Sequence, residues 1–210
     1  MSDNKNQNSQ NQTVQVKEQK QESWVVETTK TVVLSVFLAF GIRTFVAEAR
    51  YIPSESMVPT LLVNDRLIID KVSYHFHNPQ RGDIVVFDPP PDAPRQSGNE
   101  KTAFIKRVIG LPGEKIQLKG GKVYINDKPL KEEYLKRNEQ TLECMKTDDY
   151  DLAKSVIIPA NSYVVLGDNR NNSSDSRCWK FAQRDKIIGQ AFVRFWPLPR
   201  MGQLNKSPEY

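Results

Sequence analysis

Two serines lie between prolines in residues 53–61, which read Pro-Ser-Glu-Ser-Met-Val-Pro-Thr-Leu. Proline fixes its own φ angle and restricts the residue before it, so this segment is expected to be extended or tightly turned. A serine nucleophile needs such a fixed setting and a neighbouring base that takes its proton. Ser54 and Ser56 are therefore candidates for nucleophilic chemistry. The alternative is a plain loop in which both hydroxyls bond to nearby backbone groups.

A lysine occupies the middle of a short apolar run at residues 104–109, Phe-Ile-Lys-Arg-Val-Ile. Side chains alternate along a β-strand, so Lys106 is expected to share one face with Phe104 and Val108. Burial there would disfavour the ammonium form and lower the lysine pKa from about 10.4. A pKa of about 7–8 suits a general base. The alternative is an ordinary strand lysine whose amine reaches solvent.

A third polar segment, residues 167–177, reads Gly-Asp-Asn-Arg-Asn-Asn-Ser-Ser-Asp-Ser-Arg. In an extended chain Ser173, Asp175 and Arg177 point to the same side. Asp175 and Arg177 can hold each other as an ion pair, which leaves Ser173 able to hydrogen-bond to a neighbour such as a neutral lysine. The alternative is a polar surface loop.

The composition restricts the other classes of chemistry. The 210 residues include two histidines, His75 and His77, and two cysteines, Cys144 and Cys178. Two cysteines are too few for a disulfide scaffold or a cysteine-rich zinc site, and whether they pair stays open. The His-x-His spacing has no evident third metal ligand, so we expect a structural or exposed role. The net charge of +5 forms no basic stripe with aromatic residues, which argues against nucleic acid as a partner.

An uncharged apolar run at residues 31–42 indicates a membrane segment. Extended to residues 28–47, with Lys30 and Arg43 near its ends, it is long enough for a transmembrane anchor. The rival interpretation is a cleaved signal peptide, because Ala-Glu-Ala at residues 47–49 resembles a cleavage site. About thirty residues precede the run, more than a usual signal peptide has, so we expect an anchor rather than a cleaved signal or a buried core helix.

Residues 1–24 are predicted to be a disordered cytoplasmic tail. Thirteen of the first 23 residues are Asn, Gln or Ser, so the tail cannot bury enough apolar surface to offset the entropy cost of ordering. Lys17, Lys20 and Lys30 lie in the fifteen residues before Thr31, whereas only Arg50 is basic in the fifteen residues after Ala47. The positive-inside rule then predicts a single pass with the remainder of the chain outside the cytoplasm.

Residues 48–210 are predicted to form an all-β or β-rich antiparallel domain. Short runs rich in Val, Ile, Phe and Tyr alternate with turn sequences such as Gly-Asp, Asn-Asp and Leu-Pro-Gly-Glu. The charged stretch at residues 115–160 is expected to form a smaller inserted subdomain. The expected strands cover residues 66–69, 84–87, 103–109, 122–125, 155–158, 163–166 and 191–195.

Together these segments resemble the type I signal peptidases (leader peptidases), membrane-bound proteases with a Ser–Lys dyad that remove signal peptides. The family's Pro-Ser-x-Ser-Met-x-Pro-Thr-Leu box matches residues 53–61, and its lysine box matches Lys106 with Gly-Leu-Pro-Gly-Glu at residues 110–114. Its Gly-Asp-Asn-x-x-x-Ser-x-Asp-Ser-Arg box matches residues 167–177. Residues 81–87, Arg-Gly-Asp-Ile-Val-Val-Phe, resemble a further family strand. The matches occur in the family order and directly follow the expected anchor.

The resemblance implies a role for each matched residue. Ser56 would be the nucleophile and Lys106 the general base. The backbone N–H of Ser56 and the hydroxyl of Ser54 would form the oxyanion hole. Three residues would support this machinery, the first by orienting the lysine: Ser173, Asp175 and Arg177. A Ser–Lys enzyme of this kind needs no cofactor and no metal.

Two positions depart from the commonest family pattern. Glu55 stands where most members have glycine between the two serines, which adds a charge near the site and removes glycine's backbone freedom. Lys180 stands where many relatives have glycine, so the local turn is not determined by the pattern.

The resemblance also implies the partners. The substrates would be signal-peptide-bearing preproteins with small residues at positions −1 and −3, and a lipid membrane would be a partner. Phe192, Phe195 and Trp196 would belong to an apolar surface that faces lipid, or they would simply pack in the core. The membrane would be the plasma membrane. The thylakoid membrane is the alternative, because residues 49–54 and 70–74 look most like the cyanobacterial and plastid thylakoid branch.

Two other classes of protein share parts of this pattern. A self-cleaving repressor with a Ser–Lys β core would begin with a DNA-binding helix-turn-helix, whereas this sequence has a polar tail and an apolar run. A catalytically silent, membrane-tethered domain that binds exported peptides would not need every reactive position filled. We therefore expect a serine endopeptidase that removes signal peptides by acyl transfer.

Overall fold

The computed structural model describes residues 24–42, 46–94, 102–136, 139–142, 144 and 150–204. The chain divides into two compact units, Met1–Phe45 and Val46–Tyr210. The predicted disordered tail lies outside the described residues except for Trp24, so it stays a prediction.

The first unit contains a helix, Trp24–Gly41, that is long and apolar enough to cross a membrane. Its 18 residues rise by about 27 Å, close to the hydrocarbon thickness of about 30 Å. None of this helix is buried, contrary to the core-helix alternative. Its bounds differ from the predicted residues 28–47, because the helix already includes Trp24 and because Ala47 begins a β-strand.

The second unit is built mainly from antiparallel strands, so the predicted β-rich fold class is confirmed. Its larger sheet has the strand order β1-β2-β11-β3-β4-β9-β10, and β12 pairs with β11. All the pairs in this sheet are antiparallel. The bounds are Ala47–Tyr51 (β1), Arg66–Asp70 (β2), Ile84–Phe87 (β3), Phe104–Gly110 (β4), Ser162–Leu166 (β9), Ala182–Gln183 (β10), Ile187–Trp196 (β11) and Gly202–Gln203 (β12).

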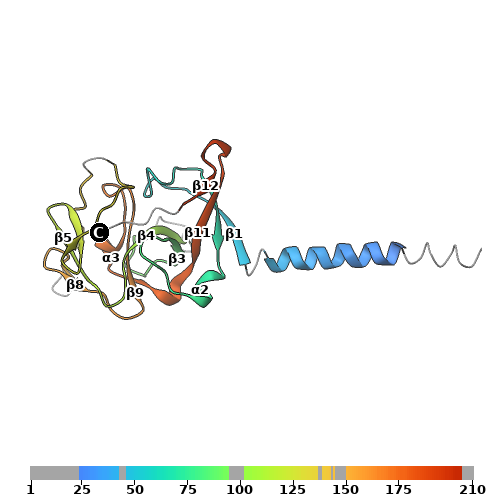
Figure 1. Cartoon of the computed structure of the whole chain (residues 1–210), viewed down its shortest axis with the longest axis horizontal. Helices are drawn as coiled ribbons and strands as arrows, with labels where there is room; N and C mark the ends of the chain where they lie inside the picture. The colour runs from blue at the N-terminus through green and yellow to red at the C-terminus, as the bar shows by residue number, and fades with distance from the viewer. Residues whose placement is uncertain are drawn as a thin grey trace, which may run out of the picture. The chain divides into compact units, whose positions relative to one another are not determined.

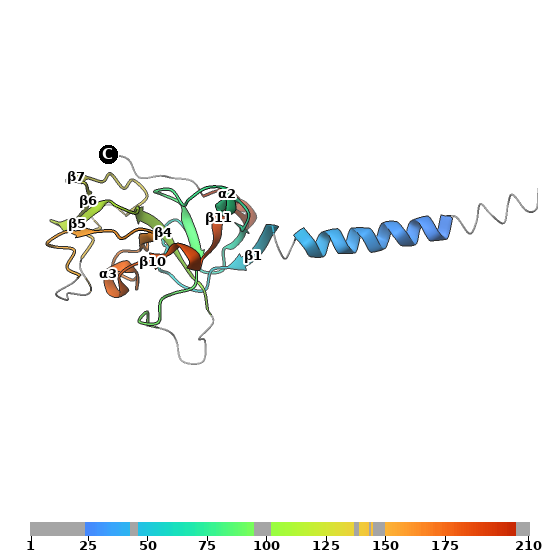
Figure 2. The same ribbon diagram turned by 90° about the horizontal axis from the view of Figure 1, so that it is seen from below.

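A smaller sheet has the order β7-β6-β5-β8 and lies at the end of this unit opposite to β1 (Figures 1 and 2). These strands fall within residues 115–160, where the sequence predicts a subdomain. However, their side chains share one core with Ile109 of β4 and with Val164 and Leu166 of β9, so the two sheets pack together. The bounds are Lys115–Lys119 (β5), Lys122–Ile125 (β6), Lys128–Pro129 (β7) and Val156–Ile157 (β8).

Burial on both faces makes the centre of the larger sheet rigid. All four residues of β3 and all five residues of β9 are buried. In β4, which lies between them, Val108 packs in a core cluster with residues of β3 and β9, whereas Ile109 belongs to the core below the smaller sheet. A side chain on β4 is therefore held by a strand that has neighbours on both edges and on both faces.

The Ala-Glu-Ala sequence at residues 47–49 is part of β1. In the register of β1 and β2, Ala47 is opposite Asp70 and Ala49 is opposite Ile68. A cut after Ala49 would separate most of this strand from the sheet. The Ala-Glu-Ala residues of the alternative cleavage site are therefore part of the folded sheet.

Candidate active site

Residues 53–61, the candidate nucleophile segment, lie in the connection between β1 and β2, and apolar side chains hold this segment in place. Ile52, Met57 and Leu61 are buried in one core cluster with residues of β2 and β3. Backbone hydrogen bonds of Ile52 to the residues that precede β2 close the base of the loop. Ser56 lies inside this loop with 8% of its surface exposed.

Lys106 of β4 contacts the nucleophile segment directly. Its Nζ donates a hydrogen bond of 2.7 Å to the Ser56 Oγ, although the two residues are 50 positions apart in the chain. Lys106 is only 5% exposed. Its Nζ also lies 5.6 Å from the centre of the Phe104 ring, as expected for two side chains on one face of a strand.

The surroundings of Lys106 favour its neutral form. Burial lowers the pKa of Lys106 from 10.5 to about 8, because desolvation disfavours the ammonium ion. The nearby carboxylates of Asp175 and Asp168 oppose this shift, and the charge of Arg177 acts with it. Near pH 8 about half of the lysine is therefore neutral and has a lone pair that can accept the Ser56 proton.

Ser54 presents a second hydroxyl beside the nucleophile. The Ser54 Oγ lies 3.4 Å from the Ser56 Oγ, and Ser54 is exposed. A hydroxyl in this position can turn toward an oxygen that is bound next to Ser56 and donate a hydrogen bond to it.

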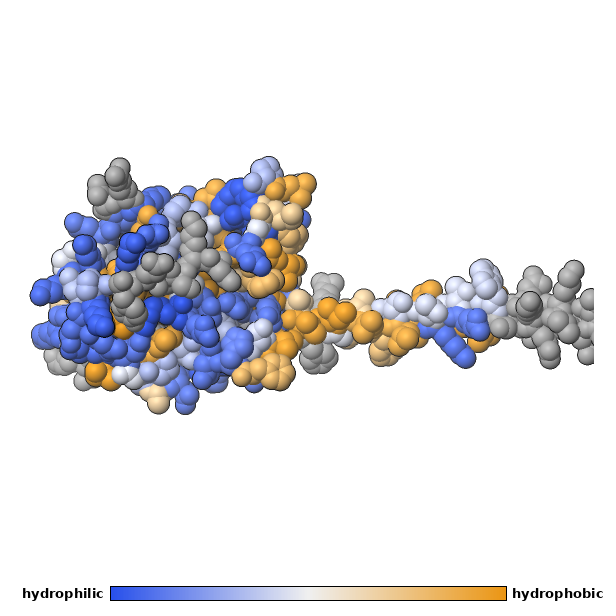
Figure 3. Space-filling view, viewed as in Figure 1, coloured by the Kyte–Doolittle hydropathy of each residue, from blue (hydrophilic) through white to orange (hydrophobic). Residues whose placement is uncertain are grey.

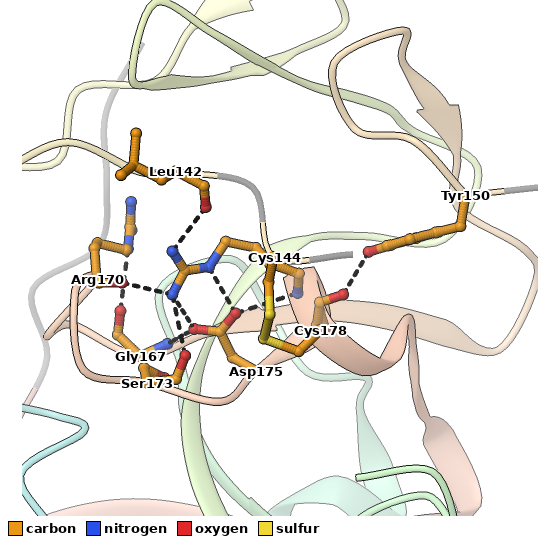
Figure 4. The surroundings of a disulfide bond; sticks show 10 residues. Leu142, Cys144, Tyr150, Gly167, Arg170, Ser173, Asp175 and Cys178 are labelled. Carbon is orange, nitrogen blue, oxygen red and sulfur yellow. Dashed lines mark hydrogen bonds and ion pairs between the residues drawn. A yellow bond between two sulfur atoms is a disulfide. The ribbon is translucent and has the colours of Figure 1, made fainter. Parts of the chain in front are cut away.

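Asp175 and Arg177 form a buried ion pair behind the site (Figure 4). Arg177 donates to both carboxylate oxygens at 2.8 Å, and the backbone N–H of Gly167 donates to Asp175 Oδ2 at 3.0 Å. Burial by itself would raise the pKa of Asp175. The hydrogen bonds and charge of Arg177, with the Gly167 amide, nevertheless hold that pKa below 3.8. The carboxylate therefore stays ionised. Its hydrogen bond from the Gly167 amide holds the segment 167–177 against the end of β9.

Ser173 is brought to the same place but makes no hydrogen bond with the lysine. Its Oγ is buried and makes no hydrogen bond of good geometry with a described residue, although it lies near enough to Asp175 to help lower that carboxylate's pKa. A Cβ on Gly167 would lie 2.2 Å from the Ser173 Oγ and 2.5 Å from the backbone O of Ser56. Only glycine therefore fits between these two serines, and the orienting role of Ser173 stays a prediction.

A second buried ion pair, without a predicted role, joins all three segments. Arg107 donates to the two oxygens of Asp168 at 2.9 and 2.6 Å, and Thr60 Oγ1 donates to Asp168 Oδ2 at 2.5 Å. Both charged side chains are fully buried. The sequence could have indicated this pair, because Thr60, Arg107 and Asp168 each belong to one of the three matched segments. Strand alternation places Arg107 on the face of β4 opposite to Lys106.

Cys144 and Cys178 form a disulfide, which the sequence left open. The Cα atoms are 4.8 Å apart, and Figure 4 shows the bond next to Asp175. Cys178 lies in the short helix α3 (Ser176–Trp179), which Asp175 caps by accepting a hydrogen bond from the backbone N–H of Arg177. Lys180 ends this helix with φ +73°, a left-handed conformation that glycine adopts more easily. The departure from glycine at position 180 is thus accommodated by a strained backbone.

The two histidines lie away from the dyad. His75 is in α2 (Ser73–Phe76) and His77 follows it, and both are exposed. Among the described residues no group of three or more His, Cys, Asp or Glu side chains is arranged to hold a metal ion.

A groove of about 320 Å³ leads to the nucleophile segment. Residues of β1, Pro53 and the start of β4 line it, including Ala49, Ile52, Ala103 and Ile105. The lining mixes apolar side chains with polar ones such as Glu48, Arg50 and Thr102, and its apolar part is compatible with the small side chains of an extended peptide.

A family model described as signal peptidase, peptidase S26, matches residues 25–196. The chain belongs to the S26 family of signal peptidases. It is 54% identical over 191 residues to a signal peptidase I of Leptolyngbya laminosa, covering 91% of this chain and 89% of the relative. It is 50% identical over 198 residues to a probable signal peptidase I-2 of Synechocystis, covering 94% and 85%. A probable thylakoidal processing peptidase 2 of Arabidopsis thaliana is 34% identical over 178 residues, covering 85% and 46%.

These relatives confirm the family that the three segments indicate. This signal peptidase is a serine peptidase, a hydrolase that removes signal peptides from preproteins. Neither the relatives nor the geometry supports a catalytically silent binding domain, since all the reactive positions are filled and Ser56 contacts Lys106.

Proposed function

We propose that Ser56 is the nucleophile of this signal peptidase and that Lys106 is its general base. The observation that carries this assignment is the 2.7 Å contact between the Ser56 Oγ and the Nζ of a buried lysine. A Ser–Lys dyad needs neither of the two exposed histidines, and it needs no metal or cofactor.

In the proposed reaction, neutral Lys106 accepts the Ser56 proton while the Ser56 Oγ attacks the carbonyl carbon of the scissile bond. The ammonium of Lys106 then donates its proton to the leaving amine, and an acyl-enzyme remains on Ser56. A water molecule gives a proton to the same lysine as it attacks this ester, and the lysine returns that proton to the departing Ser56 Oγ, which restores the starting state. The oxyanion formed in each step is bound by the Ser56 backbone N–H and the Ser54 hydroxyl.

The residues behind the dyad have positioning roles in this proposal. Asp175 and Arg177 hold the third segment against β9, and Ser173 orients the Lys106 amine when substrate is bound. Support comes from the buried ion pair and from the close packing of Ser173 on Gly167, next to the backbone of Ser56.

The substrates would be preproteins with small residues at positions −1 and −3. An extended peptide that lies along β1 and the start of β4 can pair with exposed strand edges and place alternate side chains in the groove. The apolar part of the groove includes Ala49, Ile52, Ala103 and Ile105, which suits alanine-like side chains.

The Trp24–Gly41 helix would anchor the enzyme in a membrane by a single pass, with its N-terminus in the cytoplasm and the β unit outside. The lysines before the helix support this orientation. The disulfide is a second argument, because disulfides persist in oxidising compartments. The host membrane would be the plasma membrane or, by likeness to the Arabidopsis relative, a thylakoid membrane.

An apolar face of the β unit would contact the lipid. Figure 3 shows apolar side chains gathered on the side that carries β1, β11 and β12. Phe192 and Trp196 are 43% and 47% exposed, so simple core packing does not account for them, whereas Phe195 is partly buried. We define the apolar face by its large exposed side chains: Tyr51, Phe192, Trp196, Leu198 and Met201.

The dyad is tested with the full-length enzyme in detergent and a preprotein that has alanine at −1 and −3. Ser56→Ala and Lys106→Met are each expected to lower kcat/KM by about 10³-fold or more, because each removes one half of a nucleophile–base pair. Lys119→Met, at an exposed lysine of β5, serves as the matched control and keeps wild-type activity. Cleavage by a folded Lys106→Met variant at the wild-type rate would contradict the assignment.

A further inference from the structure

The buried charges around the nucleophile are paired with one another. Each of three arginines is ion-paired with a carboxylate, so these pairs contribute no net charge: Arg107–Asp168, Arg170–Glu132 and Arg177–Asp175. Glu55 differs from them. It directly precedes Ser56, it is exposed, and it makes no ion pair with any residue that the structure describes.

Two asparagines from the loop after β9 hold Glu55 in place. Asn172 Nδ2 donates to Glu55 Oε2 at 3.3 Å, and Asn169 Nδ2 donates to the backbone O of Glu55 at 3.1 Å. A side-chain amide is neutral, so it orients the carboxylate without cancelling its charge. Consecutive Cα atoms are about 3.8 Å apart. The charge therefore lies within a Debye length, about 8–10 Å, of a bond that reacts at Ser56.

Glu55 and the groove involve different segments of the chain around Ser56. The groove is lined by β1, Pro53 and the start of β4, and no residue of the segment 167–177 lines it. The Glu55 carboxylate instead reaches Asn172 of that segment. A peptide whose signal part fills the groove therefore continues past Ser56 toward Glu55, with the first residues of its mature part next to the carboxylate.

We propose that Glu55 is a specificity-determining residue that selects preproteins by the charge of the first residues after the cleavage site. It favours Lys or Arg at positions +1 to +3 and disfavours Asp or Glu there. The proposal rests on the assignment of Ser56 as the nucleophile, because that assignment places the scissile bond beside Glu55.

The test compares preproteins that differ only at position +2, which is Lys, Ser or Asp, with the full-length enzyme in detergent at low ionic strength. Wild-type kcat/KM is expected to be about three- to tenfold higher for Lys than for Asp, the size expected of exposed charge pairs. The ratio falls toward one in high salt, because exposed charges are screened. A ratio that stays at one in low salt would overturn the proposal.

The Glu55→Gln variant removes the charge of residue 55 and keeps its hydrogen bond to Asn172. Glutamine keeps an oxygen that can accept the Asn172 hydrogen bond but carries no charge. The Lys-to-Asp ratio is expected to fall to about one in Glu55→Gln and to drop below one in Glu55→Lys. Asp127→Asn, at an exposed acid in the turn between β6 and β7, is the matched control and keeps the wild-type ratio. A ratio that Glu55→Gln leaves unchanged would show that the charge of Glu55 selects nothing.

The Ser substrate and the Ser56→Ala enzyme distinguish failure of this proposal from failure of the proposed function. If Ser56→Ala cuts the Ser substrate as fast as the wild type, the nucleophile assignment is wrong and the proposal falls with it. If Ser56→Ala is inactive but the wild type cuts all three substrates equally, the nucleophile stands and only the charge selection is refuted.

Discussion

Lys106 and Arg107 are neighbours in one strand, yet their surroundings give them opposite properties. Lys106 faces Ser56 and Phe104, where burial without a direct carboxylate partner lowers its pKa to about 8. Arg107 faces the other side and is ion-paired with Asp168. Strand alternation thus places a reactive amine and a permanent charge on opposite faces of β4. At the residue scale, the proposed dyad therefore makes the pH response of the enzyme depend on this single buried amine.

The pH dependence of kcat/KM follows from this pKa. Lys106 is active as a base only when neutral, so kcat/KM is expected to rise with pH along a limb whose midpoint lies at about 8. Between about pH 6.5 and 8 the neutral fraction, and with it the rate, increases by about 15-fold. Initial rates measured with one preprotein across this range test the expectation.

The control for the pH profile is the double variant His75→Gln/His77→Gln. Both histidines are exposed and away from the dyad, so the limb should stay where it is. A limb that moves or disappears in this variant would assign the titration to a histidine instead.

At the element scale, the site forms where one central strand and two loops lie next to one another. β4 carries Lys106 and Arg107, the β1–β2 connection carries Ser54 and Ser56, and the segment after β9 packs behind both. The Arg107–Asp168 pair and the capped helix α3 hold these parts together. The disulfide adds a covalent link from α3 to residue 144, near the smaller sheet.

Loss of the disulfide is expected to destabilise this arrangement. The cross-link joins cysteines 34 positions apart, and closing a loop of that size contributes about 3–4 kcal/mol in the chain-entropy description. Reduction by dithiothreitol is expected to lower the melting temperature of the β unit by about 10 °C. Differential scanning fluorimetry of the full-length enzyme measures this shift.

The double variant Cys144→Ser/Cys178→Ser is the control for reduction. It should melt at the temperature of the reduced wild type and should not respond to dithiothreitol. Equal melting temperatures for the oxidised and reduced wild type would mean that the cross-link contributes nothing measurable.

At the scale of the whole molecule, an apolar helix and an apolar face of the β unit both suit a lipid surface. The exposed side chains of the apolar face lie on β1, β11 and the residues before β12, while the smaller sheet is at the opposite end of the β unit (Figures 1 and 3). Exposed patches of this kind mark interaction sites in soluble domains. A membrane bound at this face would keep the groove close to emerging preproteins.

The double variant Phe192→Ser/Trp196→Ser tests the apolar face. Cleavage by the full-length enzyme in proteoliposomes is expected to fall about tenfold, because the apolar side chains no longer enter the lipid. In detergent the activity should stay near that of the wild type. Ile157→Ser, at an exposed residue of the smaller sheet, is the matched control and should behave as wild type in both settings. An equal loss in detergent would point to misfolding rather than lipid contact.

The local pattern of the chain was sufficient for the fold class and for the family. Alternating apolar residues and turn chemistry predicted the strands, and Asn126 and Asp127 adopt the positive φ angles that a tight hairpin turn requires. The three reactive segments were recognisable because proline, glycine and the reactive side chains recur at fixed short spacings. Short-range backbone preferences act within a few residues, so they are visible in the sequence itself.

Only the tertiary structure could bring distant residues into contact. Ser56 and Lys106 are 50 positions apart, Arg107 and Asp168 are 61 apart, and the cysteines had no visible reason to pair. These contacts depend on which strands become neighbours in the sheet, and long-range pairing depends on the packing of the whole core. The helix Trp24–Gly41 differs from the predicted residues 28–47 in a way that also depends on sheet pairing, because Ala47 pairs with Asp70 of β2. The sequence by itself determined which groups can react, and the sheet decided which of them meet.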